Sequence, residues 1–276
     1  ETGAKDAGDK LDLIETNAQG DVSKESSFID SLISAGVKAI IVSPVSADGS
    51  YRAIRRAHDA GIPVICYNTC LNDADMKSYV SAYAVGDPYE FGHKLGDAAG
   101  DYFLAEKKTA PKIAILNCEF VEVCVTRRKG FEDALKAKVP GATIVANQEG
   151  AILDKAVSVA STILSANPDI DAFFGEAGGA TLGAARAVKS QGKTGKVVVF
   201  GGDMTTEIAQ ELSDFSIVKA VVDISGQGLG KLALVQAVKA IDGQAPSDIK
   251  VPYNIDLYKS SDDAKAWLKA HADGLP

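Results

Sequence analysis

One local pattern repeats along this chain: a short apolar stretch, a polar or glycine-rich turn, and an amphipathic segment of helical length. Clear examples of the apolar stretch are residues 38–42 (KAIIV), 64–67 (VICY), 112–116 (KIAIL) and 196–200 (KVVVF). These runs are continuous rather than alternating, which is typical of strands covered by helices on both faces. Parallel strands need crossover connections, and the intervening helical segments supply them. The pattern therefore predicts an α/β fold with parallel sheets.

The same reading assigns most of the remaining chain. We expect further strands at residues 11–16, 79–82, 143–147, 172–175, 218–222 and 255–258. Helices are expected at residues 24–35, 50–60, 89–104, 126–139, 155–165, 180–190, 207–212 and 229–240, with a last short helix from Ser260. Gly36 and Gly61 stand where left-handed C-caps belong. Because the strand–helix unit runs twice in succession, we expect two similar lobes rather than one large sheet.

Charge and hydropathy exclude several classes of partner. The chain has 276 residues, a formal net charge of −8 and a pI near 5.0. Nucleic acids and anionic membranes bind clustered positive charge, so neither is expected as a partner. No apolar stretch approaches the ~18 residues that a membrane-spanning helix needs. The sequence opens directly into a helix-like stretch, ETGAKDAGDKL, without the pattern of a signal peptide, so an exported protein would start after its cleavage site.

The four cysteines form two close pairs, Cys66 with Cys70 and Cys118 with Cys124. Neither pair has C-x-x-C spacing, and none of the three histidines is near a pair, so we expect no metal site. Two interpretations remain open. The cysteines are either reduced, buried thiols, or one or both pairs form short disulfides in an oxidising compartment, with Cys118–Cys124 the better candidate.

Five segments carry a family resemblance: AIIVSPVSADGSYRAIRRAHDAGIPVICYN, RRKGFEDAL, GATLGAARAVKSQGK, VVVFGGDM and QGLGKLALVQAVKAIDG. In this order they resemble the motifs of the periplasmic sugar-binding proteins of ABC transporters, the ribose-binding-like branch of the type 1 periplasmic binding proteins. The resemblance implies two doubly wound, parallel-sheet lobes joined by a three-segment hinge. One lobe would hold residues 1–86 and 224–256, and the other residues 87–223 and 257–276, closing on a monosaccharide by hinge motion.

The family pattern also begins with a strand and a ligand-contacting loop ahead of its first helix. This sequence starts inside that helix. We therefore expect the sheet of the first lobe to lack a central strand.

A sugar offers hydroxyls that both donate and accept hydrogen bonds, together with an apolar ring face. The resemblance places polar ligand contacts at strand ends, where Asp203, Asp223, Asn68 and Ser43 stand, and at Arg127 in the motif TRRKGF. The planar fork of an arginine suits paired sugar oxygens.

Structural alternatives apply to several of these residues. Asp203 would otherwise cap the next helix, and Asp223 would be a solvated strand end. Phe120, in the loop NCEFVEVC, is the candidate for an aromatic platform, beside Tyr67 and Tyr83; its alternative is a core residue. Trp267 is expected in the core.

One motif departs from the family. The family's N-D-x-x-A-x-G-A pattern corresponds here to EAGGATLGA, from Glu176 to Ala184. Ala177 and Gly178 stand in place of the usual Asn and Asp. A hydrogen-bonding group is therefore lost, which puts ribose itself in doubt. Glu176 either compensates or is a strand-end carboxylate that points elsewhere.

These observations favour a periplasmic solute-binding protein that captures a monosaccharide or sugar alcohol and delivers it to the permease of an ABC transporter. We expect a monomer without cofactor or nucleic-acid partner. One alternative is a furanosyl ligand of the autoinducer-2 type, since AIIVSPVSADG resembles that subgroup as well. Another is the effector-binding core of a lac-repressor-like regulator, which would need a helix-turn-helix. An enzyme is not expected, because the sequence shows no nucleophile–base pair, metal cluster or dinucleotide fingerprint.

Overall fold

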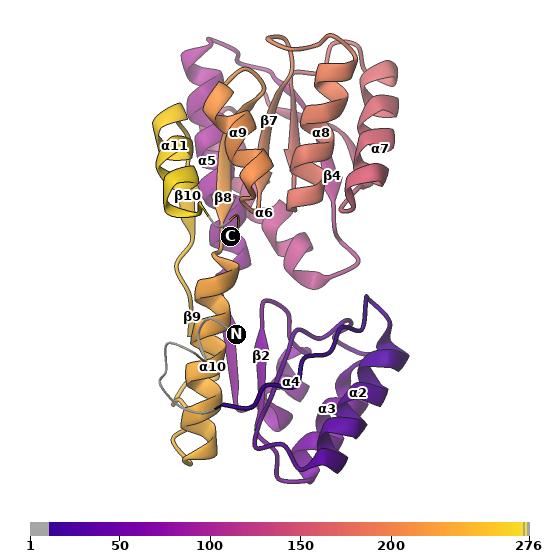
Figure 1. Ribbon diagram of the computed structural model, residues 1–276. Helices are drawn as coiled ribbons and strands as arrows, with labels where there is room; N and C mark the ends of the chain where they lie inside the picture. Colours follow the sequence, from indigo (N-terminus) through magenta and orange to yellow (C-terminus); the bar gives the residue numbers. More distant parts are fainter. Residues whose placement is uncertain (1–10, 273, 275–276) are drawn as a thin grey trace. The chain divides into compact units, whose positions relative to one another are not determined.

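The computed structural model describes residues 11–272 and residue 274 of the chain (Figure 1). The helix-like opening predicted for the first ten residues lies outside this range. Two compact units divide the chain. Unit 1 comprises Glu1–Gly86 and Gly226–Asn254, and unit 2 comprises Asp87–Ser225 and Ile255–Pro276. The chain thus passes from one unit to the other three times.

Unit 1 contains a four-stranded parallel sheet. Its strand order is β1 (Ile40–Val42), β2 (Val64–Tyr67), β3 (Ala82–Val85) and β9 (Lys250–Pro252). The helices are α2 (Val22–Ala35), α3 (Tyr51–Asp59), α4 (Asp73–Tyr79) and α10 (Gly226–Ile241). The apolar runs predicted as strands supply the buried centre, with Val64, Ile65 and Cys66 at most 1% exposed. The continuous apolar pattern therefore predicted a sheet covered on both faces correctly.

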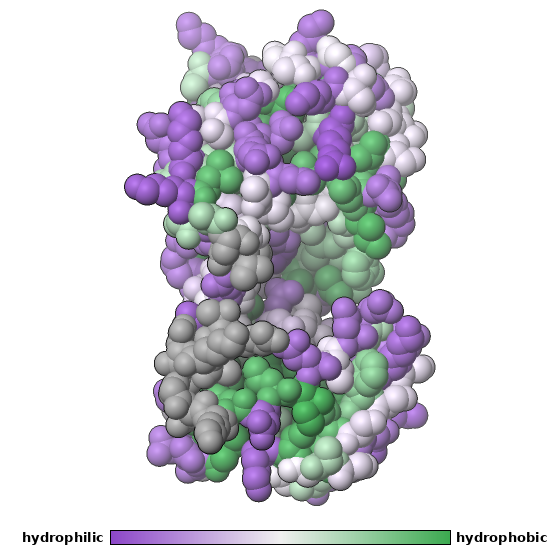
Figure 2. Space-filling model, viewed as in Figure 1, coloured by the Kyte–Doolittle hydropathy of each residue, from purple (hydrophilic) through white to green (hydrophobic). Residues whose placement is uncertain are grey.

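Two predicted strands of unit 1 are wrong. Residues 11–18 have no regular secondary structure. A strand needs a partner for its backbone groups, and no described strand lies beyond the outer edge of β1. Leu13 and Ile14 are accordingly 46% and 58% exposed, and Figure 2 shows hydrophobic side chains at the surface of this part of unit 1. The strand predicted at residues 79–82 begins later, because α4, capped by the side chain of Asn72, continues to Tyr79.

Unit 2 contains a six-stranded sheet in the order β10-β8-β7-β6-β4-β5. Its strands are β4 (Lys112–Asn117), β5 (Thr143–Glu149), β6 (Ala172–Gly175), β7 (Val198–Gly202), β8 (Val218–Asp223) and β10 (Asp256–Tyr258). All neighbours are parallel except β10, which pairs antiparallel with β8. The helices are α5 (Pro88–Ala105), α6 (Glu122–Lys138), α7 (Leu153–Ala166), α8 (Gly178–Ser190), α9 (Thr206–Asp214) and α11 (Ser261–Ala270).

Helices cover both faces of this sheet. Phe173 belongs to an apolar cluster with α7, α8, α9 and α11, whereas its neighbour Phe174 belongs to a second cluster with α5 and α6. Successive strand residues point to opposite faces, so the two clusters lie on the two sides of the sheet. Trp267 is 3% exposed within the first cluster, which confirms its predicted place in the core.

The predicted helix ends are also confirmed. Gly36 follows α2 with φ 69° and Gly61 follows α3 with φ 75°, both in the left-handed region. The hydroxyl of Ser260 accepts a hydrogen bond from the backbone N–H of Asp263 and begins α11. Within the described part of the chain, every helix is too short or too polar to cross a bilayer.

Candidate functional site

The carboxyl ends of the unit 2 strands gather four charged side chains. Glu176 directly follows β6, Asp203 directly follows β7, and Asp223 is the last residue of β8. Arg127 lies on α6, which follows β4. The carboxyl edge of a parallel sheet is where ligands bind in open α/β folds. This edge is therefore the candidate site.

Arg127 is buried, with only 6% of its surface exposed, and its guanidinium has three neighbours. Its Nη1 donates to the backbone carbonyl of Glu176 at 2.8 Å and lies 3.6 Å from Oδ1 of Asp203. The guanidinium also lies over the ring of Phe91, 3.9 Å from the ring centre. Its Nε has no hydrogen-bond partner among the described residues. The structure therefore places Arg127 as a buried, well-held donor at this edge, and its contact with a ligand stays a prediction.

The close approach of two helices places this arginine. A Cβ added to Gly92, on α5, would lie 1.8 Å from the carbonyl oxygen of Arg127, on α6. Only a residue without a side chain permits this approach. Because α5 and α6 pack so closely here, Phe91 comes beneath the guanidinium. Gly92 therefore belongs to the scaffold of the site, and nothing in the local sequence marked it.

Asp203 presents a carboxylate that is anchored yet accessible. Its backbone has φ 60°, in the left-handed region, and its side chain is 43% exposed. Oδ2 accepts a hydrogen bond from the N–H of Gly178 at 3.1 Å, at the start of α8. The positive end of the helix dipole favours a negative charge at this position. Asp203 and Arg127 therefore combine an acceptor and a donor in one rigid group.

Asp223 points into the protein instead. It is 5% exposed, and its Oδ1 accepts a hydrogen bond from the N–H of Met204 at 2.8 Å. Burial raises the pKa of this carboxyl to about 6, and repulsion by Asp203 and Asp256 adds to the effect. The alternative of a solvated strand end is wrong for Asp223. Its side chain holds the turn that leads away from Asp203.

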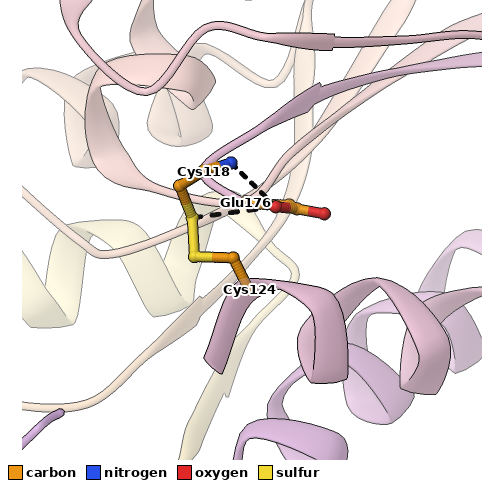
Figure 3. A group of neighbouring side chains, drawn as sticks. All are labelled: Cys118, Cys124 and Glu176. Atoms are coloured by element: carbon orange, nitrogen blue, oxygen red, sulfur yellow. Dashed lines mark hydrogen bonds between the residues drawn. A yellow bond between two sulfur atoms is a disulfide. The ribbon is translucent and has the colours of Figure 1, made fainter. Parts of the chain in front are cut away.

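Glu176 is buried beneath the loop that follows β4. Its Oε2 accepts a hydrogen bond from the backbone N–H of Cys118 at 2.9 Å and lies 3.7 Å from the sulfur of the same residue (Figure 3). Its Oε1 is buried without a partner among the described residues. Burial raises the pKa of Glu176 from its usual 4.5 to about 8. The only sequence signal for this residue was the departure from the family motif.

Both cysteine pairs are joined as disulfides, Cys66–Cys70 and Cys118–Cys124. This settles the alternatives left open by the sequence in favour of disulfides in both pairs. The sulfurs of Cys118 and Cys124 lie close to the carboxylate of Glu176. The thiolate, rather than a disulfide sulfur, is the metal ligand. We therefore assign no metal site to this group.

Phe120 stands at the tip of the loop closed by Cys118–Cys124. It is 69% exposed, so the alternative of a core residue is wrong. Ile152, just before α7, is exposed to the same extent. Both residues follow strands of the same carboxyl edge, β4 and β5. The role of Phe120 as an aromatic platform stays a prediction; Ile152 was not predicted from the sequence, because no motif marks it.

In unit 1, the structure brings the loops of Ser43 and Asn68 together. The hydroxyls of Ser43 and Thr69 lie 2.8 Å apart. Asn68 is exposed, has φ 59°, and accepts a hydrogen bond at its carbonyl from the hydroxyl of Tyr83 at 2.8 Å. The Cys66–Cys70 disulfide closes this turn. The amide of Asn68 is therefore presented by a rigid turn at the carboxyl end of β2.

Ser43 also lines a cavity of about 240 Å³ within unit 1, beside β1. The buried carboxylate of Glu25 contributes to its wall: Oε2 accepts a hydrogen bond from the N–H of Val45, while Oε1 has no partner among the described residues. Residues 16–20 also line the cavity. The cavity thus lies along the edge of β1 that pairs with no strand of the described residues.

The chain is similar to periplasmic binding proteins. A family model described as a periplasmic binding protein domain matches residues 1–245. The ABC transporter periplasmic-binding protein YphF of Escherichia coli K12 is 58% identical over 273 residues, which cover 99% of this chain and 84% of that protein.

Solved structures show the same fold. The binding protein of the arabinose ABC transporter of Shewanella sp. ANA-3, bound to α- and β-L-arabinofuranose, superposes with a TM-score of 0.87 at 25% identity, covering 99% of this chain and 88% of that one. A protein of Mycobacterium smegmatis in complex with β-D-fucofuranose gives a TM-score of 0.88 at 26% identity, with the same coverages.

Proposed function

This chain belongs to the family of periplasmic binding proteins of ABC transporters, and we propose that it captures a monosaccharide or a sugar alcohol. The observation that carries the proposal is the rigid pair of Arg127 and Asp203 at the carboxyl edge of unit 2. A fixed donor beside a partly exposed acceptor matches the vicinal hydroxyls of a sugar, each of which donates and accepts. A family of solute-binding proteins also gives no reason to assign an enzymatic step.

The remaining candidate residues receive distinct roles in this proposal. Phe120 offers an exposed aromatic face for the apolar side of a sugar ring. Asn68 and Ser43, at the carboxyl ends of unit 1 strands, offer an amide and a hydroxyl. Asp223 acts indirectly, because its buried carboxyl holds the N–H of Met204, next to Asp203. Contact with the ligand is therefore assigned chiefly to Arg127 and Asp203.

The similar structures support a sugar or a polyol as the solute. Those quoted above hold arabinofuranose and fucofuranose, and a solute-binding protein of Mycobacterium smegmatis at 25% identity holds glycerol, which supports a small neutral sugar or polyol for this chain too. A furanosyl ligand of the autoinducer-2 type is the second candidate, because the segment AIIVSPVSADG also resembles that subgroup. We further propose that the protein acts in the periplasm as a monomer, without a cofactor, and passes its solute to a membrane permease. The acidic balance of the chain does not favour a DNA-binding regulator.

A thermal-shift screen against pentoses, hexoses, polyols and autoinducer-2 tests the proposal. At 100 times its dissociation constant a ligand adds about 2.7 kcal/mol to the free energy of unfolding, a rise of several degrees in Tm. Arg127→Ala should abolish the rise. Arg186→Ala, which removes an exposed ion pair with Glu207 on the same unit, should preserve it. If no member of the panel raises the Tm of the wild type, the proposed function is wrong.

A further inference from the structure

A disulfide ties the start of α6 to the end of β4. Cys118 is the first residue after β4, and Cys124 lies in the first turn of α6. The bond between them closes the loop that carries Phe120. Arg127 follows Cys124 by three residues, about one helical turn. The position of Arg127 along the edge of the sheet therefore depends on where this loop starts the helix.

Glu176 joins the same loop to Arg127 through two hydrogen bonds. Its side-chain Oε2 accepts from the N–H of Cys118, while its backbone carbonyl accepts from Nη1 of Arg127 (Figure 3 shows the first). The disulfide, Glu176 and the guanidinium of Arg127 are thus linked in one buried series of contacts, in which Glu176 contacts Cys118 through its carboxyl and Arg127 through its backbone carbonyl. All four residues are at most 6% exposed. Solvent therefore offers few alternative partners if one contact is lost.

We propose that the Cys118–Cys124 disulfide and Glu176 are positioning residues for Arg127, so that breaking the disulfide weakens sugar binding more than it weakens the fold. This rests on the proposed function, in which Arg127 contacts the ligand. A dithiol reductant would break the sulfur–sulfur bond by giving up two electrons and two protons. Two cysteine thiols form, and the reductant closes into its own disulfide. Sugar affinity then depends on the redox state of unit 2.

The electrostatics of Glu176 give the proposal a second readout. Glu119, from the loop after β4, repels a charge on Glu176, while Arg127 and Arg128, from α6, attract it. Asp203, after β7, lies on the other side of Arg127. Burial outweighs these effects and holds the carboxyl protonated up to a pKa of about 8. Above that pH the new carboxylate competes with the ligand for the guanidinium of Arg127, and sugar affinity falls.

The test follows the ¹⁵N resonance of Arg127 Nε, which needs no ligand, alongside the dissociation constant for the sugar that the screen identifies. In Cys118→Ala/Cys124→Ala, we expect the Arg127 resonance to shift or broaden and the dissociation constant to rise ~10–100-fold, the range for losing one charge-assisted hydrogen bond. Arg186 serves as the internal reference. The matched control, Cys66→Ala/Cys70→Ala, removes the disulfide of unit 1 and should leave the Arg127 resonance unchanged.

A second variant covers the case in which the double alanine variant does not fold. In Glu176→Gln the dissociation constant and the Arg127 resonance should no longer change between pH 7 and pH 9, whereas both should change in the wild type with a midpoint near 8. An unchanged Arg127 resonance in Cys118→Ala/Cys124→Ala overturns the positioning role. So does a wild-type pH profile that Glu176→Gln retains. Failure of the wild type to bind any sugar overturns the proposed function alone, because the resonance is read without ligand.

Discussion

The buried carboxyl of Glu176 makes a quantitative prediction about stability. Its pKa is about 8 in the folded protein against an ordinary 4.5, so the folded state keeps a proton that the unfolded chain releases. The stability that protonated Glu176 contributes is therefore fully present below pH 4.5 and is lost as the pH rises through 8. Glu176→Gln removes the proton equilibrium while keeping an oxygen that accepts from the N–H of Cys118.

The magnitude follows from the pKa difference. Each pH unit between the two values costs about 1.4 kcal/mol, so full ionisation of Glu176 would remove roughly 5 kcal/mol. Movement of the loop toward solvent would reduce this, and we expect ~3–5 kcal/mol. At pH 5 the variant should be within about 1–3 kcal/mol of the wild type, because either residue leaves one buried polar group without a partner. At pH 8.5 the variant should be the more stable protein.

Urea unfolding at pH values from 5 to 8.5 measures this difference. The chain has one tryptophan, Trp267, buried at 3% exposure in the core of unit 2, so its fluorescence reports the unit that contains Glu176. The quantity compared is the free energy of unfolding of the variant minus that of the wild type at each pH. A difference that stays constant from pH 5 to pH 8.5 would refute the assignment of a buried, protonated Glu176.

Three further predictions concern other parts of the structure. Gly92→Ala should destabilise the protein by about 3 kcal/mol or more, because the added Cβ meets the carbonyl of Arg127 at 1.8 Å. Gly230→Ala, on α10 of unit 1 and with open space at its Cβ, should be neutral or slightly stabilising; urea unfolding followed by circular dichroism, which reports both units, measures both variants. Phe120→Ala should change stability by less than about 0.5 kcal/mol, since the ring is 69% exposed, yet raise the dissociation constant for the sugar ~3–10-fold in calorimetry; an unchanged constant would exclude Phe120 as a platform. Asp223→Asn should abolish the loss of about 3 kcal/mol in unfolding free energy that the raised pKa of about 6 gives the wild type between pH 3.8 and 6; equal pH profiles would contradict this.

The sequence predicted the elements whose signal is local. Continuous apolar runs identified the parallel strands of both sheets, and a capping serine identified the start of α11. By contrast, β9 is three residues long and exists through its pairing with β3, where Lys250 lies opposite Tyr83. Such a partner is distant in the chain, and no local pattern reveals it. The segment at residues 11–16 shows the converse, since a strand-like pattern forms no strand without a neighbour.

The candidate site likewise has some features that the sequence predicts and others that it does not. Strand-end polar residues such as Asp203 could be placed from the pattern, because a parallel sheet brings its carboxyl ends to one edge. The burial of Arg127 could not, because it depends on the close approach of α5 and α6 at Gly92. The role of Glu176 depends likewise on its distance from Cys118, 58 residues earlier in the chain. Contacts between distant segments, rather than local propensity, determine these two features.

The most direct test of the central claim is a calorimetric titration of the purified chain with the best sugar or polyol from the screen, followed by chemical analysis of the recovered solute. We predict saturable binding of one molecule per chain, loss of that binding in Arg127→Ala, and recovery of the solute unchanged. Absence of binding, or recovery of a chemically altered sugar, would contradict the account.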